Sequence, residues 1–349
     1  MLALRWHGRG DVRLDDIPPP PPPGAGEVQL AVEWCGICGT DVEEYHSGPH
    51  FIPAGAPHPL TGRMAPLTLG HEFSGTVVAR GPGVADLAVG DRVAVDALIF
   101  CGTCYWCKRH QVSLCEKLAA VGQMTDGGLA ALCNAPAYSC FRLPDQVSFE
   151  AGALAETLAV TVRAVRRGRM RIGERVAIIG AGAIGLMAVQ TARAGGAAEV
   201  FVSEPHSERA ERARQLGATV ITGAELRQLG ADLVIECSGA PAAIPSAIAA
   251  ARKGGRVVLV GIYGGPVTLD ALSIVTTERE IIGSLSHVYD EDFKTAIGLL
   301  ADGSVRAEPV ITHRVPIERA LEDGLLALAN HPENHIKILI RSRSEERLF

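Results

Sequence analysis

The stretch Val176-Ala177-Ile178-Ile179-Gly180-Ala181-Gly182-Ala183-Ile184-Gly185 decides the fold of this chain. Four apolar residues of strand type lead directly into the pattern G-x-G-x-x-G, and helical periodicity follows over 184–194. In such a turn the first glycine permits the tight bend, the second lets the backbone approach a pyrophosphate, and the third lets the helix pack on the strand. Free N–H groups at the start of the helix favour phosphate. Gly180, Gly182 and Gly185 therefore predict a dinucleotide-binding turn, and a glycine-rich turn without a nucleotide is the alternative.

An acidic residue stands where the adenosine ribose of such a dinucleotide is bound. Glu204 follows the next strand-like run, about 20 residues beyond the glycines. A carboxylate there accepts hydrogen bonds from the ribose 2′-OH and repels a 2′-phosphate, so we predict NAD rather than NADP. Arg209 lies nearby and keeps NADP open, because an arginine can accept a phosphate. The alternative for Glu204 is an exposed loop carboxylate.

The pattern of strand-like and helix-like segments changes at about residue 154. After it, strand-like runs alternate with helix-like segments; the runs lie at 176–179, 200–203, 233–236 and 257–260, and a helix-like segment lies at 208–216. This alternation is typical of a parallel, doubly wound sheet. Before it, short β runs are broken by glycine and proline; they lie at 28–32, 73–79 and 92–95. We therefore predict an α/β chain with a β-rich domain and a doubly wound domain.

The two ends of the chain carry weaker signals. Six prolines at 18–23 predict a stiff connector between two strands, with a ligand for a proline-binding module as the alternative. Near the carboxyl end, residues 293–300 and 317–329 have the pattern of amphipathic helices, and 336–340 that of a strand which could belong to either domain. The charge run at 341–347 predicts a solvated end.

Composition excludes several functional classes. The 349 residues carry a net charge of −6, so the chain has no basic field that would attract nucleic acid or anionic lipid. The sequence shows neither a signal peptide nor a run of about 18 apolar residues, so we expect no membrane partner. The nine cysteines are odd in number and partly clustered, which favours a reducing, cytoplasmic setting over a disulfide framework.

Four clustered cysteines predict a zinc site. Cys101, Cys104, Cys107 and Cys115 have the spacing C-x2-C-x2-C-x7-C. Four thiolates within so short a segment can close a tetrahedral shell around one Zn²⁺ using local loop geometry alone. A closed shell leaves no position for substrate, so this zinc is expected to be structural. A set of free thiols that has lost its zinc is the alternative.

A second group of metal-ligating residue types stands apart from this cluster, in Cys38-Gly39-Thr40-Asp41 and Gly70-His71-Glu72. A lone cysteine or histidine is more often structural than ligating, but here both accompany a dinucleotide motif and a zinc motif. From about residue 28 to 341 the chain resembles the zinc-dependent medium-chain alcohol and polyol dehydrogenases. The segments 45–62 and 69–75, together with 203–205 and 311–314, are similar to those of the 2,3-butanediol dehydrogenases.

The resemblance implies a GroES-like catalytic domain, formed by residues 1–157 and 296–349, and a Rossmann NAD-binding domain at 158–295. It also implies two zinc ions per subunit, with Cys38, His71 and Glu156 as ligands of the catalytic ion. A glutamate rather than a cysteine at the third position is the pattern of the polyol branch. Glu72 is similar to the family's carboxylate near zinc, which acts as an outer group or a transient ligand.

The resemblance also implies a proton relay. The family places a hydroxyl two residues after the zinc cysteine, which is Thr40 here, and commonly a histidine five residues after it, where this chain has Glu43. Either Glu43 acts as the general base or water does. The alternatives are a turn residue for Thr40 and a plain surface carboxylate for Glu43.

From these observations we expect a cytoplasmic, zinc-dependent NAD oxidoreductase that interconverts a secondary alcohol and a ketone. The substrate expected first is 2,3-butanediol with acetoin; the alternatives are a sorbitol-like polyol and L-threonine. A rival of another class is a non-catalytic NAD-binding structural or redox-sensing protein. The family resemblance implies a homodimer or homotetramer, paired through the edges of the Rossmann sheet.

Overall fold

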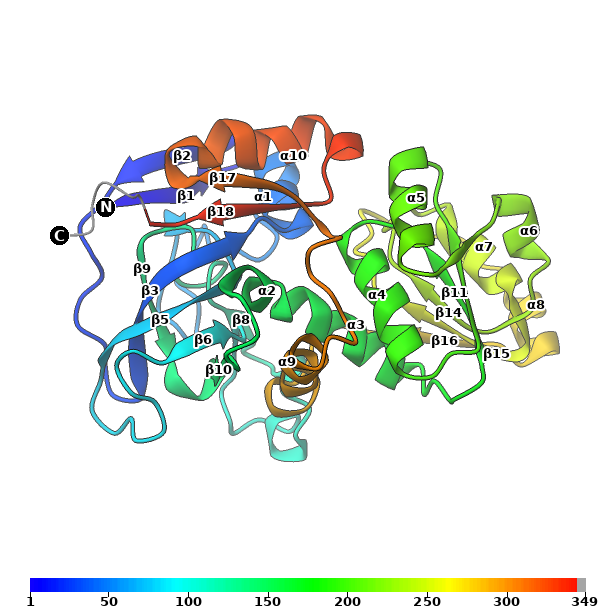
Figure 1. Ribbon diagram of the computed structural model, residues 1–349, viewed down its shortest axis with the longest axis horizontal. Helices are drawn as coiled ribbons and strands as arrows, with labels where there is room; N and C mark the ends of the chain where they lie inside the picture. The colour runs from blue at the N-terminus through cyan, green and yellow to red at the C-terminus, as the bar shows by residue number, and fades with distance from the viewer. Residues whose placement is uncertain (344–349) are drawn as a thin grey trace. The chain divides into compact units, whose positions relative to one another are not determined.

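The computed structural model describes residues 1–343, so residues 344–347 of the predicted charge run lie outside the described part of the chain. The chain forms two compact units (Figure 1). The first contains residues 1–156, 288–297 and the described residues from 311 onward, and the second contains 157–287 and 298–310. Each unit has its own hydrogen-bonded sheets, as two domains require.

The first unit is built on a seven-stranded sheet. Its strand order is β10-β6-β5-β3-β18-β17, with β9 also paired to β3, and a three-stranded sheet β2-β1-β4 and a pair β7-β8 accompany it. The strands of the unit are β1 (Leu2–Gly8), β2 (Asp11–Asp16), β3 (Glu27–Gly36), β4 (Leu67–Thr68), β5 (Glu72–Arg80), β6 (Arg92–Val95), β7 (Leu98–Ile99), β8 (Ala119–Ala120), β9 (Leu132–Pro136), β10 (Cys140–Arg142), β17 (Ile311–Pro316) and β18 (Lys337–Arg341). The strands that the sequence predicts in this part of the chain are confirmed, and β18 belongs to this unit.

Helices of the first unit are short and lie between these strands. They are α1 (Gly39–Ser47), α2 (Phe149–Ala153), the start of α3 (Ala155–Arg167), a π-helical turn (Tyr289–Phe293), the start of α9 (Lys294–Ala301), a second π-helical segment (Ala320–Leu326) and α10 (Ala327–Asn330); 3-10 turns lie at Cys107–Arg109, Val112–Leu114, Ala137–Ser139, Ile317–Arg319 and Pro332–Asn334. The polyproline run has neither helix nor strand, as its composition predicts. Helix α1 is not predicted by the sequence pattern.

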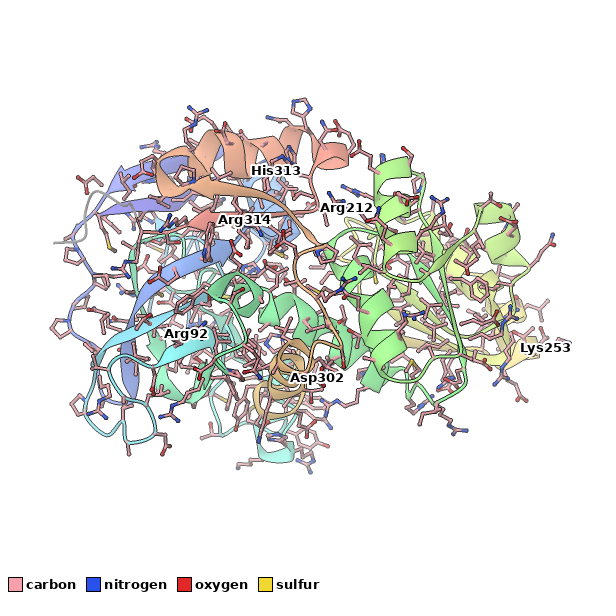
Figure 2. All side chains as sticks on the ribbon, viewed as in Figure 1. Arg92, Arg212, Lys253, Asp302, His313 and Arg314 are labelled. Atoms are coloured by element: carbon pink, nitrogen blue, oxygen red, sulfur yellow. The ribbon has the colours of Figure 1, made fainter. Side chains whose placement is uncertain are left out.

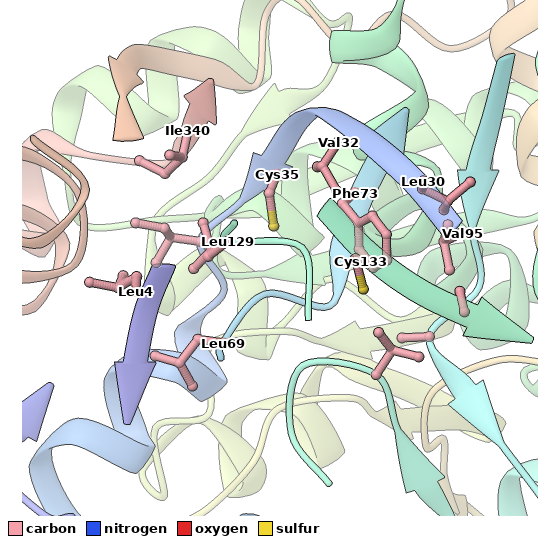
Figure 3. Packing of buried hydrophobic residues seen from close by; sticks show 14 of the residues in the cluster. Leu4, Leu30, Val32, Cys35, Leu69, Phe73, Val95, Leu129, Cys133 and Ile340 are labelled. Carbon is pink, nitrogen blue, oxygen red and sulfur yellow. The ribbon is translucent and has the colours of Figure 1, made fainter. Parts of the chain in front are cut away.

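The core of the first unit lies where its strands converge (Figure 3). Leu4, Leu30, Leu69 and Phe73 are at most 1% exposed, and Cys35 packs among them as a small apolar residue. Fully burying each of the larger side chains contributes about 1.5–3 kcal/mol. Because Phe73 follows Glu72, and Leu69 precedes Gly70 and His71, this packing fixes the backbone that carries the candidate ligands.

Two arginines hold the segment that leads into α3 (Figure 2). Arg92 donates to the carbonyl oxygen of Val147 at 2.6 Å, and its guanidinium lies 4.6 Å from the ring centre of Phe149. Arg314 donates to Glu150 at 2.7 Å. These contacts tie α2 to strands β6 and β17 and thereby orient the residues that follow it.

The second unit is a Rossmann domain. Its six strands are parallel, in the order β13-β12-β11-β14-β15-β16, which is the 3-2-1-4-5-6 order of doubly wound dinucleotide-binding folds. The strands are β11 (Arg175–Ile179), β12 (Glu199–Ser203), β13 (Thr219–Val220), β14 (Ala231–Glu236), β15 (Ala251–Leu259) and β16 (Glu280–Gly283), and the helices are α4 (Ala183–Ala194), α5 (Ser207–Gln215), α6 (Gly223–Arg227), α7 (Ala243–Ala250) and α8 (Ala271–Thr277). The predicted doubly wound sheet is confirmed.

The return of the chain to the first unit differs from the sequence-based boundary at 295/296. Residues 288–297 pack with the first unit, and residues 298–310 pack with the second. Gln190 of α4 shows why, because its amide both donates to the carbonyl oxygen of Arg306 and accepts from the Arg306 N–H. Among the described residues, no helix is both long enough and apolar enough to span a bilayer.

Candidate metal centres and dinucleotide site

The glycine-rich turn has the geometry that its sequence predicts. Gly180 has a φ of +90°, which only glycine adopts readily, and a Cβ on Gly185 would collide with the carbonyl oxygen of Gly180. Gly182 precedes the first residue of α4, and a Cβ there would meet open space. The structure therefore brings the three predicted glycines together at the start of a helix that can receive a pyrophosphate.

Glu204 lies immediately after β12, beside this turn. Its Oε2 accepts a hydrogen bond from the Ala181 N–H at 2.7 Å, and its Oε1 accepts from the His206 N–H at 2.9 Å. These two backbone N–H groups thus hold the Glu204 carboxylate next to the glycine-rich turn. Arg209 lies half-buried on α5, one turn further along the chain.

Glu236 is a buried residue of this region that the sequence analysis does not single out. It ends β14 and is fully shielded from solvent. Its Oε1 accepts from the Ser238 N–H at 2.7 Å, and its carboxylate also accepts from the hydroxyls of Ser238 and Tyr263. Burial and then the hydrogen bond to Glu236 raise the pKa of Tyr263, which therefore stays a donor. Glu236 thereby ties together the loops that follow β14 and β15.

In the first unit, Cys38, His71 and Glu72 form one compact group of donors. One ligand atom from each lies within 4.8 Å of the others. Cys38 is the residue that immediately precedes α1. His71 and Glu72 follow Gly70, whose φ is +99° and whose Cβ, if present, would collide with Cys35 and Leu129. The start of α1 and the turn at Gly70 therefore bring Cys38 together with His71 and Glu72, which are more than 30 residues away in sequence.

A buried carboxylate orients His71, and the sequence analysis does not identify it. Asp41 Oδ1 lies 3.6 Å from His71 Nδ1, and Asp41 Oδ2 accepts from the Cys38 N–H at 2.9 Å. A histidine whose Nδ1 faces a carboxylate presents Nε2 to a metal, as ligating histidines commonly do. Burial raises the pKa of Asp41, and the charge of His71 partly offsets that rise.

The charges around His71 favour a cation. Burial lowers the pKa of His71, but the negative charges of Asp41, Cys38 and Glu156 raise it by more, so the net pKa lies well above the ordinary value. A cluster of anionic donors around one imidazole therefore attracts positive charge. Thiolate, imidazole and carboxylate are also the ligand types that zinc prefers. The donor set fits a zinc ion.

Glu156 lies in the first turn of α3 and is 9% exposed. It is not a member of the compact group, whose carboxylate is Glu72. Its charge nevertheless acts on the pKa of both His71 and Lys337, so Glu156 lies near the site. The third ligand of the catalytic ion thus stays a prediction.

The proposed relay residues have clear partners. Thr40 Oγ1 lies 3.4 Å from His71 Nε2 and accepts from Gln123 Nε2 at 3.3 Å. Glu43 is exposed on α1 and accepts from Ser47 Oγ at 3.4 Å, and Ser47 Oγ lies 2.7 Å from His50 Nε2. Thr40 is therefore next to the ligand group. The role of Glu43 stays a prediction.

Glu44 stabilises the loop that follows α1. It is 1% exposed, and its carboxylate accepts from the backbone N–H groups of His50, Phe51 and Ile52 at 2.5–3.2 Å. The carboxylate thus fixes the loop that follows α1 against the helix that begins at Cys38.

The four-cysteine lobe is the second donor group. One sulfur from each of Cys101, Cys104, Cys107 and Cys115 lies within 4.8 Å of the others. The Cys104–Cys107 and Cys101–Cys107 sulfur pairs are 3.5 and 4.0 Å apart, close to the edge of about 3.8 Å expected for a tetrahedral Zn–S4 shell. The arrangement fits one zinc ion.

Backbone hydrogen bonds within the four-cysteine lobe lower the pKa of two of its thiols. N–H groups of Thr103 and Cys104 lower the pKa of Cys101 to about 6, and the Cys107 N–H lowers that of Cys104. Burial followed by the Cys104 contact raises the pKa of Cys107 to about 12, so the lobe without metal holds thiols as well as thiolates. A zinc ion would deprotonate all four.

We expect a Cys104→Ser variant to lose the lobe's zinc and to unfold at a temperature lower by at least about 5 °C, because a structural zinc contributes folding free energy. Zinc analysis and a thermal melt would measure this, with Thr103→Ser as the control. A variant that keeps both its zinc content and its melting temperature would contradict a structural role for this site.

Comparisons with known proteins agree with this arrangement. The family model of the alcohol dehydrogenase GroES-like domain matches residues 24–145, and that of the zinc-binding dehydrogenases matches 183–302. Over 98% of this chain the sequence is 34% identical to (R,R)-butanediol dehydrogenase of Bacillus subtilis (strain 168), 99% of which is covered. The chain belongs to the zinc-dependent medium-chain alcohol and polyol dehydrogenases. It is therefore an oxidoreductase with a GroES-like domain and a Rossmann domain, and the predicted family and fold are confirmed.

Further members of the family resemble the chain in sequence and structure. The crystal structure of the Bacillus subtilis butanediol dehydrogenase superposes with a TM-score of 0.90 at 34% identity, over 98% of this chain and 99% of that one. Human sorbitol dehydrogenase is 37% identical over 92% of this chain and 91% of its own length. A structure described as a zinc-binding dehydrogenase of Sinorhizobium meliloti 1021, bound to NADP, is 30% identical with a TM-score of 0.88, over 97% and 98% of the two chains. A nicotinamide dinucleotide and zinc are thus typical of the family.

Proposed function

We propose that this dehydrogenase interconverts 2,3-butanediol and acetoin, with NAD as the hydride carrier. The observation that carries the proposal is the group of Cys38, His71 and Glu72, with Thr40 beside it, in a chain that resembles a butanediol dehydrogenase over nearly its whole length. Diacetyl is a further candidate substrate, because a hydroxyketone and a diketone share the same reacting group.

In this proposal Cys38, His71 and Glu156 hold the catalytic zinc. A zinc ion there would supply a Lewis acid that favours the alkoxide form of the substrate. Asp41 lies 3.6 Å from His71 Nδ1 and favours the ring orientation that presents Nε2 to the ion, and Glu44 fixes the loop after α1. The anionic residues of the site offset the charge of the ion, so that the ion is not left as an uncompensated buried charge.

Thr40 is proposed to accept the proton that the alcohol releases. Its hydroxyl lies beside His71 Nε2, and Gln123 donates to its oxygen, which leaves the Thr40 hydrogen free to point elsewhere. From Thr40 the proton is proposed to pass to solvent through Glu43 or water. The contacts of Glu43 with Ser47, and of Ser47 with His50, offer a continuation on the surface of α1.

Steady-state rates on a substrate panel test the function. The panel contains both enantiomers and the meso form of 2,3-butanediol, acetoin, sorbitol and L-threonine, and NADH absorbance is the readout. The proposal expects kcat/KM for a butanediol isomer to exceed that for sorbitol and L-threonine by at least about tenfold, which is 1.4 kcal/mol. A preference for sorbitol would favour the second candidate, which the 37% identity to human sorbitol dehydrogenase supports. No turnover with two zinc ions bound per chain would contradict a dehydrogenase of these substrates.

The cofactor choice is proposed from Glu204. Replacing Glu204 by glutamine should shift the ratio of kcat/KM with NAD to that with NADP by at least about 100-fold toward NADP, or about 2.7 kcal/mol, because the charge that repels a 2′-phosphate is lost. Glu208→Gln, an exposed change on the same segment, is the matched control. An unchanged ratio would show that Glu204 does not select the cofactor.

We propose that two copies pair through the edge of the Rossmann sheet. Strand β16 is the last strand of that sheet, and Leu272 and Val275 of the neighbouring helix α8 are each 73% exposed. Large exposed apolar side chains beside a sheet edge are typical of an interface. Val275→Asp should convert the oligomer into a smaller species in analytical ultracentrifugation, with Val89→Asp, at an exposed site of the other unit, as the control. An unchanged sedimentation coefficient would place the interface elsewhere.

A reducing, cytoplasmic setting is proposed from the cysteines. All nine are free in the structure, and eight of them lie in the first unit. Both proposed zinc sites need thiolates, which an oxidising compartment would divert into disulfides.

A further inference from the structure

Lys337 is a buried lysine beside the group of Cys38, His71 and Glu72. It begins β18 and is 2% exposed. Its Nζ donates to Glu72 Oε1 at 2.7 Å, to Glu72 Oε2 at 2.5 Å and to the carbonyl oxygen of Ile37 at 3.3 Å. One ammonium group therefore occupies both oxygens of Glu72.

The sheet is built to allow this contact. Strands β5, β3 and β18 are neighbours, and Gly36 of β3 is paired with Glu72 on one side and with Leu339 on the other. A Cβ on Gly36 would collide with the Glu72 carboxylate. Glycine at this position thus leaves the space in which Glu72 reaches across the central strand to Lys337.

Glu72 lies between the ammonium group of Lys337 and the other members of the compact group. Its carboxylate belongs to the compact group with Cys38 and His71, and it is also the ion-pair partner of Lys337. The Nζ–Oε distances of 2.7 and 2.5 Å are those of an ammonium group paired with a carboxylate. The ammonium group of Lys337 therefore competes with a metal ion for the oxygens of Glu72.

We propose that Lys337 is a positioning residue that holds Glu72 away from the catalytic metal. This inference rests on the proposed metal centre. With Glu72 retained by Lys337, one thiolate and one further carboxylate balance the two charges of the ion. If Glu72 joined them, the ligand set would become net negative, and the metal would be a weaker Lewis acid. Lys337 therefore preserves both an open ligand position and the acidity of the ion.

Cobalt substitution tests this without reference to turnover. Co²⁺ replaces zinc in both sites, and the spectrum of a Cys38→Ser variant, which retains only the four-cysteine lobe, is subtracted. Four-coordinate cobalt absorbs more strongly in the visible than five-coordinate cobalt. Lys337→Met should therefore lose most of the remaining visible intensity, because Glu72 becomes a ligand. Its loss of metal to a chelator should slow about tenfold, and kcat should fall about 10–100-fold, as for other changes around a metal site.

Two further variants separate positioning from a merely structural role. Lys337→Arg keeps the charge and should retain the wild-type spectrum. The double variant Glu72→Gln with Lys337→Met removes both charges and should restore the wild-type spectrum, because the carboxylate that reached the metal is gone. If Lys337→Met does not fold, Lys337→Gln, which keeps a hydrogen-bond donor to Glu72 but not the charge, takes its place and should show the same loss of visible intensity.

The outcomes are distinguishable. The role of Lys337 is overturned if the Lys337→Met spectrum is identical to the wild type, or if the double variant has an altered spectrum. In either case, two cobalt ions bound per chain would show that the metal centre itself is intact. Binding of a single cobalt ion by the wild-type chain overturns the metal centre, and the inference with it.

Discussion

Replacing Glu156 by glutamine should lower kcat/KM by about 1,000-fold or more, which is about 4 kcal/mol of transition-state stabilisation. Zinc content should fall from two ions to one per chain. Glu72 is held by Lys337 at 2.5 and 2.7 Å and is proposed to stay off the ion. Glu156, in the first turn of α3, is the proposed carboxylate ligand, and its charge influences the pKa of His71. Loss of the Glu156 carboxylate, the proposed third ligand, should therefore release the ion.

The matched comparison is Glu72→Gln. That variant should keep two zinc ions, because the carboxylate it changes is proposed to be an outer group. Glu318→Gln, an exposed glutamate of the same unit, controls for the loss of one negative charge. Zinc analysis and steady-state kinetics on all three variants measure the difference. If Glu72→Gln lost the zinc and Glu156→Gln kept it, the ligand assignment would be reversed.

Features that depend on local spacing were predictable from sequence. The glycines of the turn at 180–185 and the four cysteines at 101–115 act within short segments, so their positions in the chain define their geometry. The parallel direction of the Rossmann strands follows from alternating strands and helices, because parallel strands require crossover connections. The family resemblance, rather than spacing, connected Cys38 with His71.

Features that depend on distant partners were not predictable in this way. Lys337 meets Glu72 across 265 residues, and no periodicity in β18 distinguishes it from an exposed lysine. Asp41 and Gln123 look like ordinary polar residues until the fold places them beside His71 and Thr40. Helix α1 was missed because it is short, and most of its residues are polar. The compact units divide differently from the predicted boundary near residue 295, because this division depends on contacts such as that of Gln190 with Arg306.

Two glycines of the turn at 180–185 should respond differently to replacement by alanine, because only one of them is packed against the backbone. Gly185→Ala should destabilise the protein itself, because its Cβ would collide with the backbone at Gly180 whether or not a nucleotide is present. Overpacking of this kind costs about 1–3 kcal/mol. Gly182→Ala should leave stability unchanged, because its Cβ meets open space and its φ of −69° suits alanine.

Nucleotide binding should be weakened in both variants, for different reasons. In Gly182→Ala the added methyl group would occupy the place where the pyrophosphate approaches, so Kd for NADH should rise at least about 30-fold, or 2 kcal/mol, at an unchanged melting temperature. In Gly185→Ala the rise in Kd should accompany a lower melting temperature. Fluorescence titration with NADH and a thermal melt without nucleotide separate the two. A Gly182→Ala variant that binds NADH as tightly as the wild type would mean that the phosphates do not lie against this turn.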